Sequence, residues 1–73
     1  MKFVLRVHSD DPTRGRYVCF HMFRKGPDWM LGHFAMWSAQ FNSREEAQTC
    51  IDRWAASSHP LPAETTIEEY HGF

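Results

Sequence analysis

Residues 43–55 read SREEAQTCIDRWA, and this stretch decides the fold because it combines a helix start with a helical apolar spacing. Ser43 and Glu46 form a capping box, in which the serine hydroxyl accepts from the Glu46 backbone N–H and the carboxylate reaches back. The apolar positions that follow at helical spacing are Ala47, Cys50, Ile51, Trp54 and Ala55. The stretch predicts one amphipathic helix.

Three strands are predicted before this helix. Residues 2–8 alternate between apolar and polar side chains, which is typical of a half-buried strand. Residues 16–24 and 29–38 are rich in aromatic and β-branched side chains and predict the second and third strands. Turn formers occupy residues 9–15 and 25–28, so consecutive strands form an antiparallel meander.

A last strand is predicted over residues 64–70, after Pro60 and Pro62 end the helix. The order is therefore βββαβ, an α+β fold with an antiparallel meander sheet and one helix on one face. We expect residues 1–73 to form a single domain. The last strand is expected at an edge, parallel to the first or third strand, with pairing beside the first preferred.

The pairing of the second and third strands is predicted from how cleanly it sorts their side chains. If facing residue numbers sum to an even value, one face is almost wholly apolar and suits the helix. That face holds Val18, Phe20, Met22, Met30, Gly32, Phe34 and Met36. The other face holds Tyr17, Cys19, His21, Phe23, Trp29, Leu31, His33, Ala35 and Trp37. Gly32 indicates a bulge or a close approach to the backbone.

The second face is the predicted binding surface, because one helix cannot cover both sides of the sheet. Exposed aromatic residues and arginines are typical of partner interfaces. The predicted anchors are Tyr17, Phe23, Trp29 and Trp37, with Arg16, Arg24 and Lys25 at the rim. Alternatively, terminal residues including Tyr70 and Phe73 fold over this face. Homodimerisation and a foreign protein partner both remain open.

Composition limits the classes of protein that fit. The chain has 73 residues, and no apolar run approaches the ~20 residues that span a bilayer. Two cysteines are too few for a secreted disulfide scaffold. We therefore expect a soluble, cytoplasmic protein that does not enter membranes. Residues 1–25 carry a net charge of +4 and residues 26–73 a net charge of −5, which disfavours broad binding to duplex nucleic acid.

Catalytic and metal-binding patterns are weak, so we expect no enzyme activity, metal or other cofactor. In the predicted pairing His21, His33 and Cys19 could converge, but paired zinc-ligand spacings are missing. Cys50 and His59 could form a nucleophile pair, yet Cys50 falls on the apolar helix stripe. Asp10 and Asp11 lie in a turn, where carboxylates more often bind the backbone.

Single-stranded nucleic-acid binding is the alternative function. Aromatic rings flanked by Arg16, Arg24 and Lys25 are typical of a platform on which bases stack. Nucleic acid is the less favoured partner because the helix and tail are acidic.

In format the chain resembles the small inhibitor proteins that bacteriophages and mobile elements use against their hosts, including anti-CRISPR proteins. The features are the opening MKFV (1–4), a strand-rich first half and the helix start F-x-SREEA (41–47). The resemblance implies a non-enzymatic inhibitor that binds a host CRISPR effector complex in the host cytoplasm and covers part of its surface. It assigns no role to any single residue.

Overall fold

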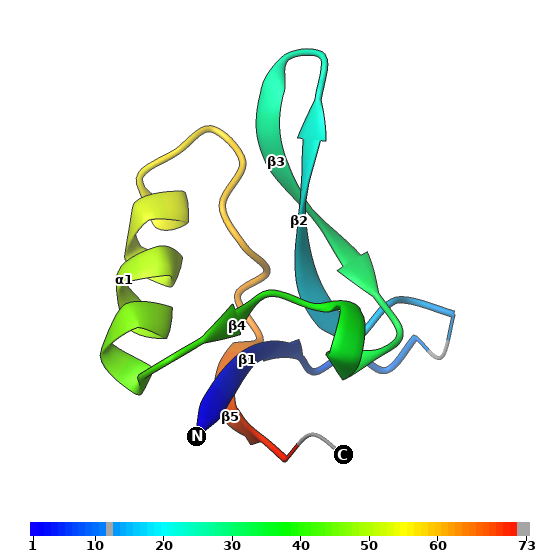
Figure 1. Ribbon diagram of the computed structural model, residues 1–73. Coiled ribbons are helices and arrows are strands. Elements are labelled where there is room, and N and C mark those ends of the chain that lie inside the picture. The colour runs from blue at the N-terminus through cyan, green and yellow to red at the C-terminus, as the bar shows by residue number, and fades with distance from the viewer. Residues whose placement is uncertain (12, 72–73) are drawn as a thin grey trace.

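The computed structural model describes residues 1–11 and 13–71. Within them, an open antiparallel sheet of five strands packs against one α-helix (Figure 1). The elements in chain order are β1 (Lys2–Val7), β2 (Tyr17–Phe23), β3 (Gly26–Gly32), the 3-10 helix η1 (Ala35–Trp37), β4 (Gln40–Phe41), α1 (Arg44–Ala55) and β5 (Thr65–Tyr70). The predicted fold class, an α+β meander with one helix, is confirmed.

Strand β1 lies at the centre of the sheet. It pairs with β5 along its whole length, from Lys2 opposite Tyr70 to Val7 opposite Thr65. Its other edge is shared by β4, opposite Phe3 and Val4, and by β2, which pairs with Arg6. Strand β3 then pairs with β2. The expected place of the last strand, beside the first, is confirmed.

The expected parallel direction of the last strand is wrong, because β5 runs antiparallel to β1. The reason is β4, a strand of two residues that is too short for a sequence pattern to reveal. Both β4 and β5 are antiparallel to β1, so they run parallel to each other with β1 between them. Helix α1 therefore makes its crossover between β4 and β5.

The third strand starts and ends earlier than the sequence predicts. It spans residues 26–32 rather than 29–38, and the chain then forms η1. The close approach expected at Gly32 is confirmed, since a Cβ there would lie 2.8 Å from the sulfur of Cys19. The end of regular pairing at Gly32 removes the second half of the predicted strand from the sheet.

Helix α1 begins where the capping box predicts. The Ser43 hydroxyl accepts from the Glu46 backbone N–H at 3.1 Å, while the Glu46 carboxylate accepts from the N–H of Asn42 at 3.0 Å. The helix packs against β1, β4 and β5, and its inner face is part of the hydrophobic core. The buried core residues are Leu5, Val7, Val18, Ala47 and Leu61. This packing fixes α1 over the body of the sheet and leaves the far end of β2 and β3 beyond it.

Candidate partner-binding surface

The β2–β3 hairpin has a different register from the predicted one. Phe20 faces Trp29 and Val18 faces Leu31, so the paired residue numbers sum to an odd value and the predicted even register is wrong. The physical reason is the turn. Phe23 pairs with Gly26, whose φ of 115° suits glycine, so the loop has two residues instead of the predicted 25–28 turn. The loop length shifts the register by one residue and exchanges the faces of β3.

The exchange redistributes the predicted binding residues. The α1 side of the hairpin now carries Val18, Phe20, Met22, Pro27, Trp29 and Leu31. The opposite side carries Tyr17, Cys19, His21, Phe23, Gly26, Asp28, Met30 and Gly32. Trp29 thus changes sides relative to Tyr17 and Phe23.

His21, His33 and Cys19, which could converge in the predicted register, do not converge in the observed one. His21 faces Asp28, and His33 follows the end of β3. In the parts of the chain that the structure describes, no group of three His, Cys, Asp or Glu side chains could hold a metal ion.

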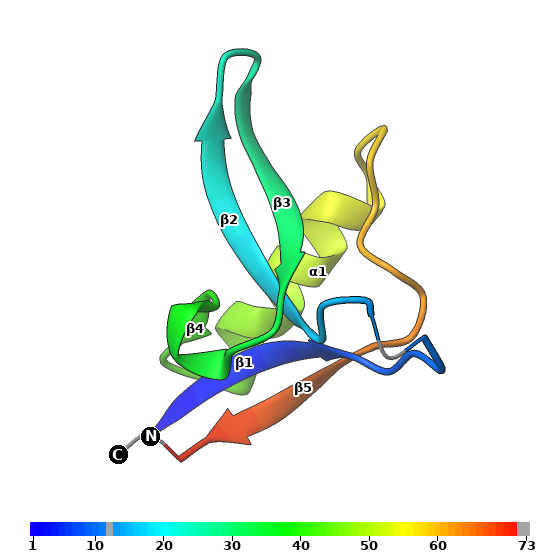
Figure 2. The same ribbon diagram turned by 90° about the vertical axis from the view of Figure 1, so that its right-hand side faces the viewer.

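The outer half of the hairpin projects beyond the rest of the sheet (Figure 2). Large apolar side chains are exposed on both of its faces. Their exposed fractions are 36% for Phe20, 78% for Met22, 48% for Phe23 and 44% for Met30. Helix α1 packs mainly over β1, β4 and β5, and Trp54 near its end meets Phe20 of the hairpin.

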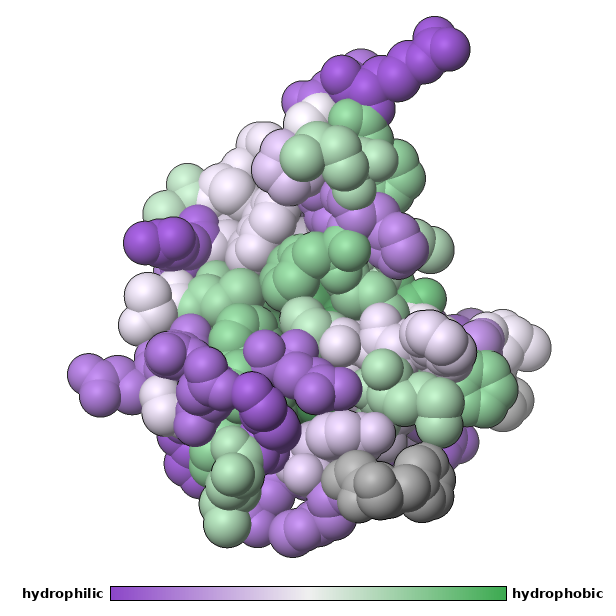
Figure 3. Space-filling view, viewed as in Figure 1, coloured by the Kyte–Doolittle hydropathy of each residue, from purple (hydrophilic) through white to green (hydrophobic). Residues whose placement is uncertain are grey.

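An apolar groove separates the hairpin from α1. It has a volume of about 490 Å³ and is lined by Phe20, Pro27, Phe41, Glu46, Thr49, Cys50, Arg53 and Trp54. Hydrophobic side chains gather between the helix and the hairpin in the space-filling view, while hydrophilic atoms project from the hairpin tip (Figure 3). The rings of Phe20 and Trp54 stack with their centroids 5.9 Å apart. The groove is therefore a surface feature shared by four elements, three of which, β2, β4 and α1, supply aromatic rings.

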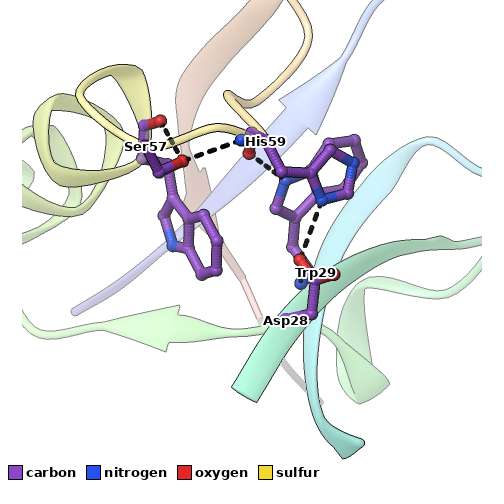
Figure 4. A network of polar contacts seen from close by, with 5 residues as sticks. Asp28, Trp29, Ser57 and His59 are labelled. Atoms are coloured by element: carbon purple, nitrogen blue, oxygen red, sulfur yellow. Dashed lines mark hydrogen bonds and ion pairs between the residues drawn. The ribbon is translucent and has the colours of Figure 1, made fainter. Parts of the chain in front are cut away.

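Trp29 has a structural role at the edge of β3 (Figure 4). Its indole N–H donates to the His59 carbonyl at 2.8 Å, and its ring stacks on the His59 ring at a centroid distance of 4.3 Å. The Asp28 carboxylate lies 2.9 Å from Nδ1 of His59 and accepts from the Trp29 N–H at 2.8 Å. These contacts hold the α1–β5 connection against Trp29 and Asp28 of β3.

The same contacts explain the acidity of Asp28. Its hydrogen bond with His59, followed by the backbone N–H of Trp29, lowers the pKa of the carboxyl below 3.8. Asp28 is therefore ionised at neutral pH and engaged within the hairpin edge.

The seven predicted binding residues lie in separate places. Phe23, Arg24 and Lys25 meet at the exposed hairpin tip. Trp29 is half-buried on the α1 side, as described above. The remaining three are Arg16, Tyr17 and Trp37, at the base of the hairpin and in η1. The structure does not gather all seven on one surface.

A second hollow lies at the base of the hairpin. It has a volume of about 220 Å³ and is lined by Tyr17, His33, Phe34, Ala35, Met36, Tyr70 and His71. Tyr70 thus lies against the Tyr17 side of the sheet, as the tail-covering alternative predicts for this residue. Phe73, which that alternative also invokes, lies outside the described residues.

The other candidate catalytic residues predicted from the sequence include Cys50, His59 and Asp11. Burial raises the pKa of the Cys50 thiol, and Cys50 lines the groove while His59 contacts Asp28 and Trp29. Asp11 accepts from the N–H and hydroxyl of Thr13 at 2.9 and 2.7 Å, which lowers the pKa of its carboxyl. The predicted loop-fixing role of Asp11 is confirmed.

Sequence reasoning missed the groove. It assigned Phe20 to the sheet face covered by the helix and Trp54 to the apolar stripe of that helix. The available signal was length, because the helix has 12 residues and spans only about 18 Å. A helix of that length cannot cover both the body of the sheet and a projecting hairpin.

Comparisons with known proteins give no relative for this chain. No family model matches it, no curated protein is similar to it, and no solved structure matches its fold. Among the described residues, no helix is both long and apolar enough to span a membrane.

Proposed function

We propose that this chain is a non-enzymatic protein-interaction domain that binds a partner protein and covers part of its surface. The observation that carries the proposal is the exposure of large apolar side chains on projecting structure. Met22 is 78% exposed, Trp37 74% and Phe34 64%. Large exposed apolar patches mark protein-interaction sites more often than they mark a monomer's ordinary exterior.

The finer form of the proposal is an inhibitor encoded by a phage or mobile element. In this form the partner is a host effector complex, as the resemblance to anti-CRISPR-type proteins implies. The architecture suits that role, since the projecting hairpin and η1 can occupy a partner surface while α1 and β1 keep the domain folded. Self-association through the same apolar residues is the competing use of this surface.

Quantitative affinity enrichment from a bacterial lysate tests the proposal. We expect the wild-type chain to enrich one protein complex. The Trp37→Ser and Met22→Ser variants should recover much less of that complex. Glu45→Ser is the matched control, because Glu45 is exposed on α1 outside the groove lining. Equal recovery of every protein by all four forms would contradict the proposal. Native mass spectrometry of the purified chain at several concentrations reports self-association independently.

A second candidate function is single-stranded nucleic-acid binding. It is favoured by three exposed cationic side chains that belong to no ion pair seen within the described residues. These side chains are Arg16, Arg24 and Lys25. Aromatic stacking plus phosphate contacts predicts tryptophan quenching by oligonucleotides that weakens steeply with salt. A titration without quenching at low salt would exclude this candidate.

A further inference from the structure

We propose that the groove between α1 and the hairpin binds an acidic segment of the partner protein, in which large apolar side chains are flanked by Asp or Glu. This inference rests on the proposed function and specifies its site and the chemistry of the partner. It arises from three observations on the described residues: the shape of the groove, the state of the charges around it, and the charges on the rest of the chain.

The shape of the groove suits an apolar side chain of a partner segment. Phe20, Phe41 and Trp54 supply rings from β2, β4 and α1, and Pro27 adds an apolar surface without a backbone N–H. Interface energy concentrates where a large side chain fills such a pocket. The apolar surface continues along the hairpin, since Met22 faces Pro27 and is 78% exposed.

The anions near the groove already have partners. The Glu46 carboxylate accepts from the backbone N–H of Asn42 at 3.0 Å. Asp28, beside Pro27, lies 2.9 Å from Nδ1 of His59 and also accepts from the backbone of Trp29.

The cations near the groove are free within the described part of the chain. Arg53 lies on the groove lining, and Arg24 and Lys25 lie at the hairpin tip. None of the three belongs to an ion pair seen among residues 1–11 and 13–71. The groove therefore favours a segment with carboxylates, although the whole chain has a formal net charge of −1.

A second copy of this chain is a poor occupant. Its exposed large apolar side chains lie on Met1, the hairpin and residues 34–37, whereas its acidic residues lie mainly on α1 and β5. Glu68 and Glu69 of β5 are already engaged by Arg6 and the two nearby histidines. No described segment of the chain combines exposed apolar anchors with several free carboxylates, so we assign the groove to a foreign protein.

The inference is tested by selecting displayed random peptides on the immobilised full chain and measuring the affinity of the selected peptides by fluorescence anisotropy. We expect enriched peptides to carry aromatic or aliphatic anchors beside Asp or Glu. Thr49→Trp places a large side chain at the groove lining and should weaken binding at least about tenfold. Arg53→Gln removes one cation and should weaken it by about threefold, with a smaller salt dependence.

Arg14→Gln is the matched control for charge. It changes the net charge by the same amount as Arg53→Gln, and Arg14 pairs with Glu64 away from the groove. Circular dichroism establishes that each variant is folded. Affinity in Arg14→Gln should equal that of the wild type.

Four outcomes would overturn the inference. Enrichment of only basic or neutral peptides contradicts the charge argument, and failure to enrich any peptide contradicts a groove for an extended segment. If acidic peptides bind the Thr49→Trp variant normally but no longer bind the Trp37→Ser variant, the site lies at η1 and the proposed function still stands. A labelled oligothymidylate serves as the nucleic-acid probe. If it binds the wild type and its binding is lost in Thr49→Trp, the groove binds nucleic acid instead.

Discussion

Strand β1 and the outer half of the β2–β3 hairpin are both rich in apolar residues, yet they differ completely in exposure. In β1, Val4 is 2% exposed and Leu5 is fully buried, so both faces of the strand are covered. In the hairpin, Met22 is 78% exposed and Met30 44%, so both faces meet solvent. The difference shows that the apolar pattern of a strand does not determine its burial. What covers the strand determines it.

The covering elements explain where burial stops. Helix α1 and the buried Leu61 cover one face of β1, and β4 and β5 occupy its edges. His59 of the α1–β5 connection contacts Trp29 and Asp28, and Trp54 of α1 stacks on Phe20. Toward the tip the side chains become more exposed, to 78% for Met22 and 48% for Phe23. The molecule thus divides into a folded body and a projecting surface, and the following substitutions test this division.

The largest effect is expected in β1. Leu5→Ala removes a fully buried side chain from the core, and such truncations cost about 2 to 5 kcal/mol of unfolding free energy. Urea unfolding followed by tryptophan fluorescence measures the loss. A cost similar to that of a surface substitution would contradict the assignment of β1 to the centre of the body.

The next largest loss of stability is expected at Gly15, where the loop between β1 and β2 packs against β3. A Cβ on Gly15 would lie 2.6 Å from the carbonyl carbon of Leu31, so the backbone must shift to admit it. We expect Gly15→Ala to cost about 1 to 3 kcal/mol. Urea unfolding of the variant checks this value. Gly26→Ala is the comparison, because a Cβ at Gly26 meets no atom within 4 Å and is opposed only by its φ of 115°.

The contact between body and hairpin should contribute less. His59→Ala removes the ring stacked on Trp29 and is expected to cost about 0.5 to 1.5 kcal/mol. The thermal midpoint should fall, and hydrogen exchange in β3 should become faster. Unchanged exchange in β3 would show that the connection does not hold this edge.

The Asp28 carboxylate should make the same contact dependent on pH. Because its pKa in the folded chain is below the ordinary 3.8, its stabilising contribution is complete above 3.8 and disappears as the pH falls through the lowered value. Asp28→Asn should therefore be less stable than the wild type at neutral pH and equal to it in strong acid. Unfolding curves across the acid range measure the difference, and a gap that persists below the lowered pKa would contradict this assignment.

The smallest effect on stability is expected at the projecting hairpin. Met22→Ser replaces a 78% exposed side chain and should change the free energy of unfolding by less than about 0.5 kcal/mol. Set beside Leu5→Ala, it gives the sharpest contrast between body and hairpin. A loss as large as that of a core truncation would show that Met22 is covered in the folded protein.

Local patterns in the sequence predicted much of the body. The capping box at Ser43 and Glu46 and the first strand are determined by neighbouring residues, and both are confirmed. The half-buried character predicted for that strand is wrong, because Val4 and Leu5 lie on opposite faces and both are buried. The close approach at Gly32 is confirmed, and the group it meets is the distant Cys19. The direction of β5 depended on β4, whose two residues give no periodic signal.

The candidate site was less predictable, because it depends on a single residue of register. The pairing of Phe23 with Gly26 moves Trp29 to the α1 side and separates it from Tyr17 and Phe23. Which residues line the groove depends on how far α1 extends over the sheet, a tertiary property. Lys25 was predicted in the turn and Arg24 at the end of the second strand, and the structure exposes both at the hairpin tip.

Methionine methyl NMR with a soluble paramagnetic agent tests most directly the central claim that the hairpin is uncovered. The four methionines sample the relevant regions, and their exposed fractions are 80% for Met1, 78% for Met22, 44% for Met30 and 46% for Met36. We predict that the agent broadens the Met22 signal as strongly as that of Met1, with Met30 and Met36 less affected, at both low and high protein concentration. A Met22 signal that stays sharp while Met1 broadens would show that the hairpin is covered and would contradict the account.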